Sequence, residues 1–217
     1  MRQAPKVKIC GVTKPEFASA AAEAGADYIG LMFAESPRRI TKEQAREIVQ
    51  AVRGKKGKQP TLVGVFVNRP PLEIATMAKE VGFDIAQLSG DEPEDELEEF
   101  TIPLIKAVHV DSSIPGPVRL LTLRRRLTFL KQRNILPLLD TKVKGKYGGT
   151  GQPFDRELAK TLAQEFDFLL AGGLTPGNVG EIVAQVQPWG VDVSSGVETS
   201  GVKDMAKIQE FLKRTKG

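Results

Sequence analysis

The chain has 217 residues and a formal net charge of +4. Its length and its hydrophobic content of 41% are enough for one well-buried core. One cysteine, Cys10, and one histidine, His109, allow no intramolecular disulfide and no Cys/His cluster for zinc, so no metal site is predicted. No uninterrupted apolar stretch suits a signal peptide or a membrane span. We therefore expect a soluble, cytoplasmic protein with no membrane partner.

Eight short apolar runs alternate with helix-like segments along the chain. The predicted strands are residues 7–10, 28–33, 62–67, 85–88, 104–108, 135–140, 168–171 and 191–193. The runs are apolar almost throughout, as is typical of parallel strands covered on both faces, and no Asn-Gly or Asp-Gly dipeptide indicates a tight hairpin. This rhythm predicts one domain over residues 1–217, a (β/α)₈ barrel of parallel strands, with a doubly wound open sheet as the alternative.

Capping residues predict where several of the helices begin. Thr13 and Thr41 are each followed, three residues later, by a glutamate or glutamine, as in a capping box. The dipeptide Thr175-Pro176 would put proline at the first helical position, where its missing N–H costs least. Residues 16–24 and 203–213 carry apolar side chains along one face, so both segments are predicted to pack as helices against the sheet.

The distribution of charge does not indicate a nucleic-acid partner. The basic segment 124–133 carries Leu127, Phe129 and Leu130 at the spacing of an amphipathic surface helix. The acidic segment 91–96 balances it, so the basic residues form no continuous stripe. A mildly basic protein still favours a small anionic substrate.

Glycine and serine residues follow the last two predicted strands. Gly172 and Gly173 come after the seventh strand, and Ser194, Ser195 and Gly196 come after the eighth. Each set alone would be an ordinary turn, but together they offer exposed backbone N–H groups where phosphate often binds in such barrels. We therefore predict a phosphate site, and the absence of a Walker A motif or a dinucleotide fingerprint argues against a nucleotide cofactor.

Two residues at predicted strand ends could move protons. Cys10 ends the first strand and Asp140 ends the sixth. A thiolate can act as a base near neutral pH, and a carboxyl group in an apolar cleft can stay protonated as an acid. Each residue also has an ordinary interpretation, since a lone cysteine is often a small buried apolar side chain and an aspartate before threonine is often a cap.

Seven short motifs occur in the order found in one enzyme family. They are KICGVT at residues 8–13, SPR at 36–38, GVFVN at 64–68, LDT at 139–141, YGGTG at 147–151, AGGL at 171–174 and DVSSGVE at 192–198. In these motifs, and over nearly its whole length, the chain resembles phosphoribosylanthranilate isomerase. The resemblance implies a (β/α)₈ barrel without a cofactor and an aldose–ketose isomerisation in tryptophan biosynthesis. The implied reaction is the Amadori rearrangement of N-(5-phosphoribosyl)anthranilate to 1-(2-carboxyphenylamino)-1-deoxyribulose 5-phosphate.

The resemblance also implies a role for several residues. Asp140 would be the general acid that protonates the ribose ring oxygen, and Cys10 would be the base that removes the proton from C2 of the sugar. Arg38 would face the anthranilate carboxylate, although the sequence alone leaves it exchangeable with Arg39. Asp192 would join the phosphate-binding residues around the substrate.

The chain departs from the family pattern at one position, since Ser89 stands in Gln-Leu-Ser-Gly where many members have histidine. Serine cannot hold a charge near neutral pH, which puts a catalytic role for this position in doubt. His109 is interpreted as a rim or structural residue. Residues 147–151 are interpreted as a mobile loop over the substrate or as a flexible connection.

Two other functions remain open at this stage. One is isomerisation or epimerisation of another phosphosugar on the same barrel, which would not need Arg38 as a carboxylate partner. The other is a phosphosugar-binding subunit without catalysis. The sequence leaves the oligomeric state undecided between monomer and homodimer.

Overall fold

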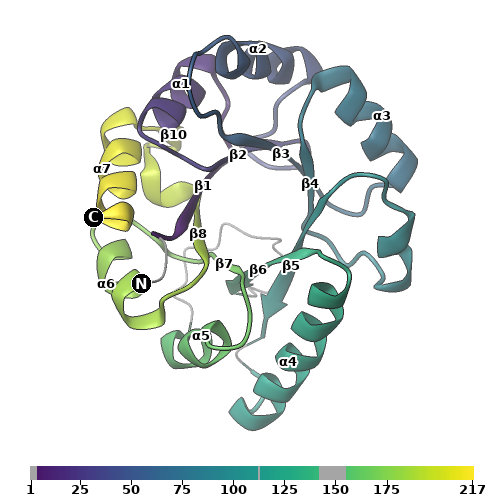
Figure 1. Cartoon of the computed structure of the whole chain (residues 1–217). Coiled ribbons are helices and arrows are strands. Elements are labelled where there is room, and N and C mark those ends of the chain that lie inside the picture. The colour runs from purple at the N-terminus through teal and green to yellow at the C-terminus, as the bar shows by residue number, and fades with distance from the viewer. Residues whose placement is uncertain (1–3, 112, 142–154) are drawn as a thin grey trace.

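Eight parallel strands form a closed barrel in the computed structural model, which describes residues 4–111, 113–141 and 155–217. Each strand pairs with the next along the chain, and the last pairs with the first (Figure 1). This confirms the predicted barrel and excludes the open sheet. The strands are β1 (Lys6–Cys10), β2 (Tyr28–Met32), β3 (Thr61–Phe66), β4 (Ile85–Leu88), β5 (Leu104–Val110), β6 (Leu136–Thr141), β7 (Leu169–Leu170) and β8 (Gly190–Val193).

Helices surround the barrel as an outer layer (Figure 1). The α-helices of the described residues are α1 (Pro15–Glu23), α2 (Lys42–Arg53), α3 (Pro71–Val81), α4 (Gly116–Gln132), α5 (Arg156–Ala163), α6 (Val179–Val186) and α7 (Met205–Lys216). The connection from β4 to β5 differs from the other units because it carries a short 3₁₀ helix, η1 (Asp95–Glu99). Between β8 and α7 lie a second 3₁₀ helix, η2 (Ser195–Val197), and a hairpin of β9 (Glu198–Thr199) and β10 (Val202–Lys203).

One predicted helix start is confirmed. Thr41 is the N-cap of α2, and its hydroxyl accepts a hydrogen bond from the Gln44 backbone N–H at 3.2 Å. The Gln44 side chain returns a bond, since its amide oxygen accepts from the Thr41 N–H at 2.9 Å. Two of the free N–H groups at the start of α2 are satisfied in this way.

Two other predicted starts are wrong. Helix α1 begins at Pro15 after Lys14, so proline at the first position sets this start and Thr13 is not the cap. Helix α6 begins at Val179, because residues 175–178 form a turn that the Asn178 side chain holds. Helix α7 also begins slightly later than predicted, at Met205, where the Asp204 carboxylate accepts from two backbone N–H groups.

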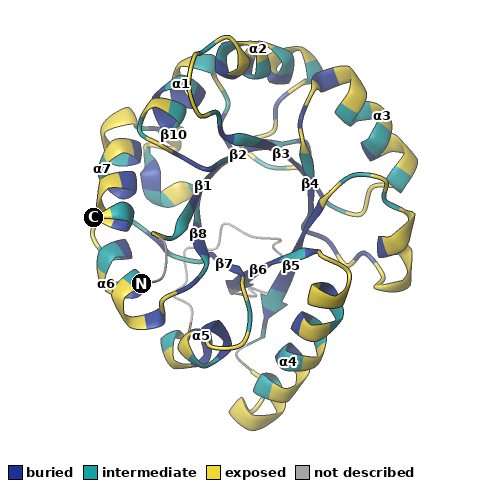
Figure 2. Ribbon diagram, viewed as in Figure 1, coloured by how far each residue is buried: buried dark blue, intermediate teal, exposed yellow. Residues whose placement is uncertain are grey.

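The core has two layers. The larger one lies between the strands and the helices, and Figure 2 colours as buried the parts of the helices that face the barrel. The smaller one fills the barrel interior, and Tyr28 and Trp189 pack against it with their rings 6.3 Å apart. Its buried members are Cys10, Val63, Val65, Ile105, Ala107, Leu138, Leu169 and Ala171. The barrel is therefore a packed core, and substrate must bind where the strands end.

No helix in the described part of the chain is both long enough and apolar enough to cross a bilayer. The same residues contain no group of three His, Cys, Asp or Glu side chains that could hold a metal ion.

Candidate active site

Cys10 and Asp140 both lie at the carboxyl ends of strands, on the face where active sites of such barrels form. Both are buried, with 4% and 6% of their surface exposed. Gly30, the neighbour of Cys10 on β2, leaves room for the thiol, because a Cβ at this position would lie 2.8 Å from Cys10 Sγ. The structure therefore brings the predicted base and acid to one rim of the barrel, about five strands apart along the sequence but on the same face.

The Cys10 thiol stands in a strongly charged environment. Burial raises its pKa, and the ammonium groups of Lys8 and Lys203 act in the opposite direction. The Asp192 carboxylate adds to the effect of burial. Burial is the largest of these effects, so Cys10 is a thiol at neutral pH in the free protein and must lose its proton before it can act as a base.

Asp192 already has a partner inside the barrel. Its Oδ1 lies 2.8 Å from Nζ of Lys8, and β1 and β8 pair these two residues in register. Lys8 is fully buried, whereas the Asp192 side chain keeps 10% of its surface exposed. Asp192 can therefore contact both the buried ammonium below it and a substrate above it.

Arg38 is held beside Cys10 by a carboxylate that the sequence did not single out. Its guanidinium donates two hydrogen bonds to Glu198, from Nε at 2.6 Å and from the terminal nitrogen at 2.8 Å. Hydrogen bonding to Glu198 raises the pKa of Arg38, which also interacts with Cys10 by charge. Arg39, in contrast, is exposed, so the geometry favours Arg38 as the carboxylate partner.

Glu198 joins the partly buried Arg38 to a second cation, the buried Lys203. Lys203 Nζ lies 2.5 Å from Glu198 Oε1 and also donates to the backbone oxygen of Ser194 at 2.9 Å. Glu198 occurs at the end of the DVSSGVE motif and could have been found there. Lys203 had no comparable signal, because the β9–β10 hairpin that brings it to Glu198 was not predicted.

The predicted phosphate residues come together at the ends of β7 and β8. Gly172 and Gly173 both have positive φ values, 98° and 65°, which glycine adopts without strain. Gly196 lies against the loop after β7 so closely that a Cβ would be 1.8 Å from the Leu174 oxygen. Ser195 is exposed and is the first residue of η2. The Ser194 hydroxyl donates to the Cys10 carbonyl at 3.1 Å. The two loops are thus adjacent and fixed to β1.

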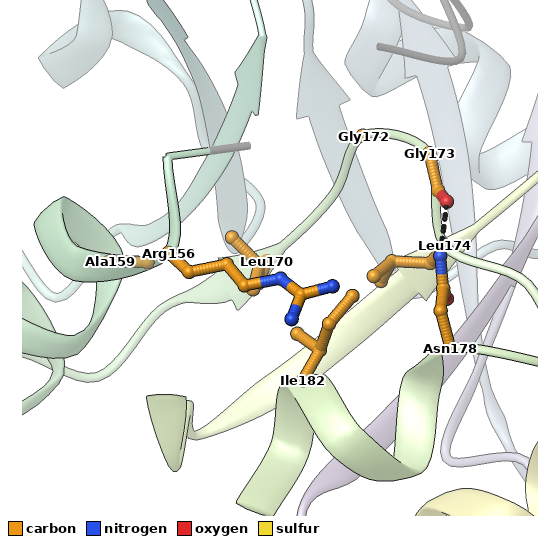
Figure 3. A pocket seen from close by; sticks show the side chains of 8 residues that line it. All are labelled: Arg156, Ala159, Leu170, Gly172, Gly173, Leu174, Asn178 and Ile182. Carbon is orange, nitrogen blue, oxygen red and sulfur yellow. Dashed lines mark hydrogen bonds between the residues drawn. The ribbon is translucent and has the colours of Figure 1, made fainter. Parts of the chain in front are cut away.

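A pocket lies behind the Gly172-Gly173 turn, outside the barrel. In Figure 3 the Arg156 side chain extends from α5 towards Ile182 of α6, and Asn178 donates to the Gly173 oxygen at 2.9 Å. The remaining lining residues are Ala159, Leu170, Gly172 and Leu174. Arg156 is bound to Glu181 at 2.6 Å. The pocket shares Gly172 and Gly173 with the predicted phosphate site and borders that turn from the helix side.

Ser89 and His109 lie near the predicted acid. His109 Nε2 is 3.0 Å from the Ser89 carbonyl oxygen, and β5 and β6 pair His109 in register with Asp140. Burial lowers the pKa of His109, so the ring is neutral at pH 7. The Gln87 side-chain amide donates to the Ser89 hydroxyl at 2.9 Å. Residues 147–151, the predicted loop over the substrate, lie outside the described residues.

The family model described as N-(5'-phosphoribosyl)anthranilate (PRA) isomerase matches residues 7–214. The chain belongs to this family. It is 41% identical to N-(5'-phosphoribosyl)anthranilate isomerase of Dehalococcoides mccartyi over 211 residues, which cover 97% of this chain and 95% of that protein.

Solved structures of the family share the fold. A crystal structure of phosphoribosyl anthranilate isomerase in complex with reduced 1-(o-carboxyphenylamino)-1-deoxyribulose 5-phosphate is 35% identical, with a TM-score of 0.78 and 98% of both chains covered. A structure of monomers of the dimeric isomerase from Thermotoga maritima is also 35% identical, with a TM-score of 0.76 and the same coverage. Monomeric and dimeric forms thus both occur among the structural neighbours.

Proposed function

We propose that this chain, acting as a single domain over residues 1–217, converts N-(5-phosphoribosyl)anthranilate to 1-(2-carboxyphenylamino)-1-deoxyribulose 5-phosphate. Its membership of the isomerase family supports the reaction. The observation that carries the assignment of roles is the meeting of Cys10 and Asp140 at the same rim of the barrel, beside Arg38. This rearrangement needs a proton donor for the ring oxygen, a base for the proton at C2 and a cation for the anthranilate carboxylate.

Asp140 is the general acid in this proposal. Its carboxyl proton goes to the ribose ring oxygen as the bond from that oxygen to C1 breaks, which leaves an iminium at C1. Cys10, as thiolate, takes the proton from C2, and the electron pair of that bond forms the enolamine. Tautomerisation to the ketone completes the rearrangement without a net change in oxidation state. The acid and the base must act in opposite protonation states at one pH.

The other residues hold the two ends of the substrate. Backbone N–H groups of the loops with Gly172, Gly173, Ser194, Ser195 and Gly196 would bind the phosphate. Arg38 would pair with the anthranilate carboxylate in the fork geometry that guanidinium and carboxylate share. Because Glu198 already holds Arg38, the guanidinium is oriented before the substrate arrives.

Turnover of freshly made phosphoribosylanthranilate by the purified protein, followed by the loss of anthranilate fluorescence, tests the function. We expect steady conversion of this substrate and none of non-aromatic phosphosugars. Conversion of a non-aromatic phosphosugar alone would favour another isomerase on the same barrel. Calorimetric binding without conversion would identify a binding subunit, and either result would overturn the proposal.

The cytoplasm is the location that fits this reaction, because a phosphorylated sugar is charged and stays in the compartment where it is made. The oligomeric state, monomer or homodimer, is a separate question that sedimentation of the purified chain answers.

A further inference from the structure

The barrel interior contains a buried ion pair directly below the proposed base. Lys8 and Cys10 are two residues apart on β1, so their side chains point to the same face, into the barrel. Lys8 is fully buried, and its Nζ lies 2.8 Å from Asp192 Oδ1 on the neighbouring strand. The positive charge of this ammonium acts on the Cys10 side chain and lowers the pKa of the thiol.

Burying a charged side chain inside a packed barrel costs free energy, because the charge loses its hydration. Taking an ammonium and a carboxylate out of water carries a desolvation penalty that their attraction need not repay, so a buried pair is weak evidence for stability. An apolar pair of similar size would fill this space, as apolar side chains do elsewhere in the interior. The pair lies next to the one group in the site that must become an anion within the core.

Several charged groups face the Cys10 thiol. They are Lys8 on β1, Asp192 on β8, Lys203 on β10 and Arg38 in the segment between β2 and α2. Lys203 and Arg38 are both bound to one carboxylate, Glu198, and Arg38 is assigned to the substrate. Lys8 is the one of these cations that is not bound to Glu198, since its ammonium is paired with Asp192.

We propose that Lys8, held in place by Asp192, is a positioning residue that stabilises the Cys10 thiolate. This inference rests on the proposed role of Cys10 as the base. Asp192 has two opposing effects here, since it fixes the ammonium but its own negative charge disfavours the thiolate. Lys8 keeps its proton although burial alone lowers its pKa, because Asp192 and Cys10 raise that pKa above the ordinary value.

Thiolate absorbance in the ultraviolet tests this inference without relying on activity. Cys10 is the single cysteine, so the signal belongs to one group once the titration of a Cys10→Ala variant, which retains the tyrosines, is subtracted. In Lys8→Met we expect the thiol pKa to rise by about one unit or more, a tenfold lower thiolate fraction at a given pH. Lys6→Met is the matched control, because Lys6 lies on the same strand but its ammonium contacts Asp27.

A second variant separates electrostatics from loss of packing. Asp192→Asn keeps a side-chain oxygen that can accept from Lys8 but removes the negative charge, so the thiol pKa should fall. Shifts of opposite sign in Lys8→Met and Asp192→Asn cannot come from a loosened barrel. If Lys8→Met does not fold, as judged by circular dichroism, Lys8→Gln, which removes the charge but leaves a polar group for Asp192, is titrated in its place.

An unchanged thiol pKa in folded Lys8→Met, an equal rise in Lys6→Met, or an unchanged or raised pKa in Asp192→Asn would overturn the inference. Failure of the proposed function has a different signature, which is no conversion of phosphoribosylanthranilate by the parent protein. Failure of Cys10 as the base would appear as undiminished turnover in Cys10→Ala. Both are distinguishable from failure of the inference, because the thiol titration is measured in the free protein.

Discussion

At the scale of single residues, the chemistry depends on how a buried thiol is charged. Cys10 has little exposed surface, and the desolvation of its thiolate is the largest influence on its pKa. A thiol with a raised pKa makes a strong base once ionised, but only a small fraction is ionised near neutral pH. The groups around Cys10 set that fraction, and with it the rate of proton removal.

The pH dependence of kcat/KM reports this thiol, because kcat/KM reflects the pKa values of the free enzyme. Raising the pH increases the thiolate fraction, and since the folded-state pKa lies above the ordinary thiol value, the rise should continue past that ordinary value. Rates measured on the parent protein across the neutral and alkaline range check this. A plateau reached below the ordinary thiol pKa would contradict it.

Removing the charge of Glu198 should weaken substrate binding. Glu198→Gln loses the paired, charge-assisted hydrogen bonds to Arg38, so the guanidinium is no longer held in one orientation. We expect KM to rise about tenfold, equivalent to about 1.4 kcal/mol, with a smaller change in kcat. Glu73→Gln is the control, because Glu73 makes an exposed pair with Arg69 and neither residue is assigned to the site. Equal KM values in the parent and Glu198→Gln would disprove this role of Glu198.

The residues of the site differ in how well the sequence predicts them. Cys10 and Asp140 are predictable, because a parallel barrel brings all strand ends to one face whatever their separation along the chain. The choice between Arg38 and Arg39 is not, since adjacent residues differ in direction only once the segment after β2 has folded. The link from Arg38 through Glu198 to Lys203 depends on the β9–β10 hairpin, whose two-residue strands are too short to leave a periodic pattern.

At the scale of elements, the site depends on close contact between the loops after β7 and β8. Gly196 touches the Leu174 backbone, which cannot move aside as a flexible side chain could. The Thr175-Pro176 prediction failed in the same region, because the Asn178 side chain accepts from the Thr175 N–H and delays the helix. Competing side-chain hydrogen bonds of this kind cannot be ranked from a local pattern.

Gly196→Ala should separate these loops. The added Cβ would lie 1.8 Å from the Leu174 oxygen, so the backbone must shift, and the N–H groups that the proposal assigns to phosphate shift with it. We expect a lower melting temperature together with a KM at least several-fold higher. Gly116→Ala is the matched control, since nothing lies near a Cβ added there. A Gly196→Ala variant that keeps the parent KM would mean that these loops do not hold the substrate.

At the scale of the whole molecule, barrel closure follows from the repeated alternation of apolar runs with helical segments. The sequence did not indicate that the β4–β5 unit carries a 3₁₀ helix. Its acidic segment has no apolar periodicity that would distinguish a 3₁₀ helix from an α-helix. Closure is reinforced near the strand beginnings, where Asp27 bonds to Lys6 of β1, to Lys58 and to Lys216 of α7. Segments from both ends of the chain thereby meet at one carboxylate.

Asp27→Asn should destabilise the fold in a pH-dependent way. Burial alone raises the pKa of Asp27, but hydrogen bonds from Lys216 and Lys58 outweigh it and lower the pKa to about 2. A folded-state pKa below the unfolded value adds stability above the unfolded pKa, and this stability is lost as the pH falls towards the folded pKa. Urea unfolding at pH 7 should show a loss of about 2 kcal/mol that shrinks below pH ~4. A loss of stability below pH ~4 as large as the loss at pH 7 would exclude this charge effect.

The central claim is that Cys10 and Asp140 are the base and the acid of one isomerisation, and the turnover of phosphoribosylanthranilate by Cys10→Ala and Asp140→Asn tests it most directly. Both substitutions remove the proton-transferring group with little change in volume, and circular dichroism and melting temperature establish that each variant folds. We predict that each lowers kcat by at least about 100-fold relative to the parent protein. Near-parental turnover in either folded variant would contradict the claim.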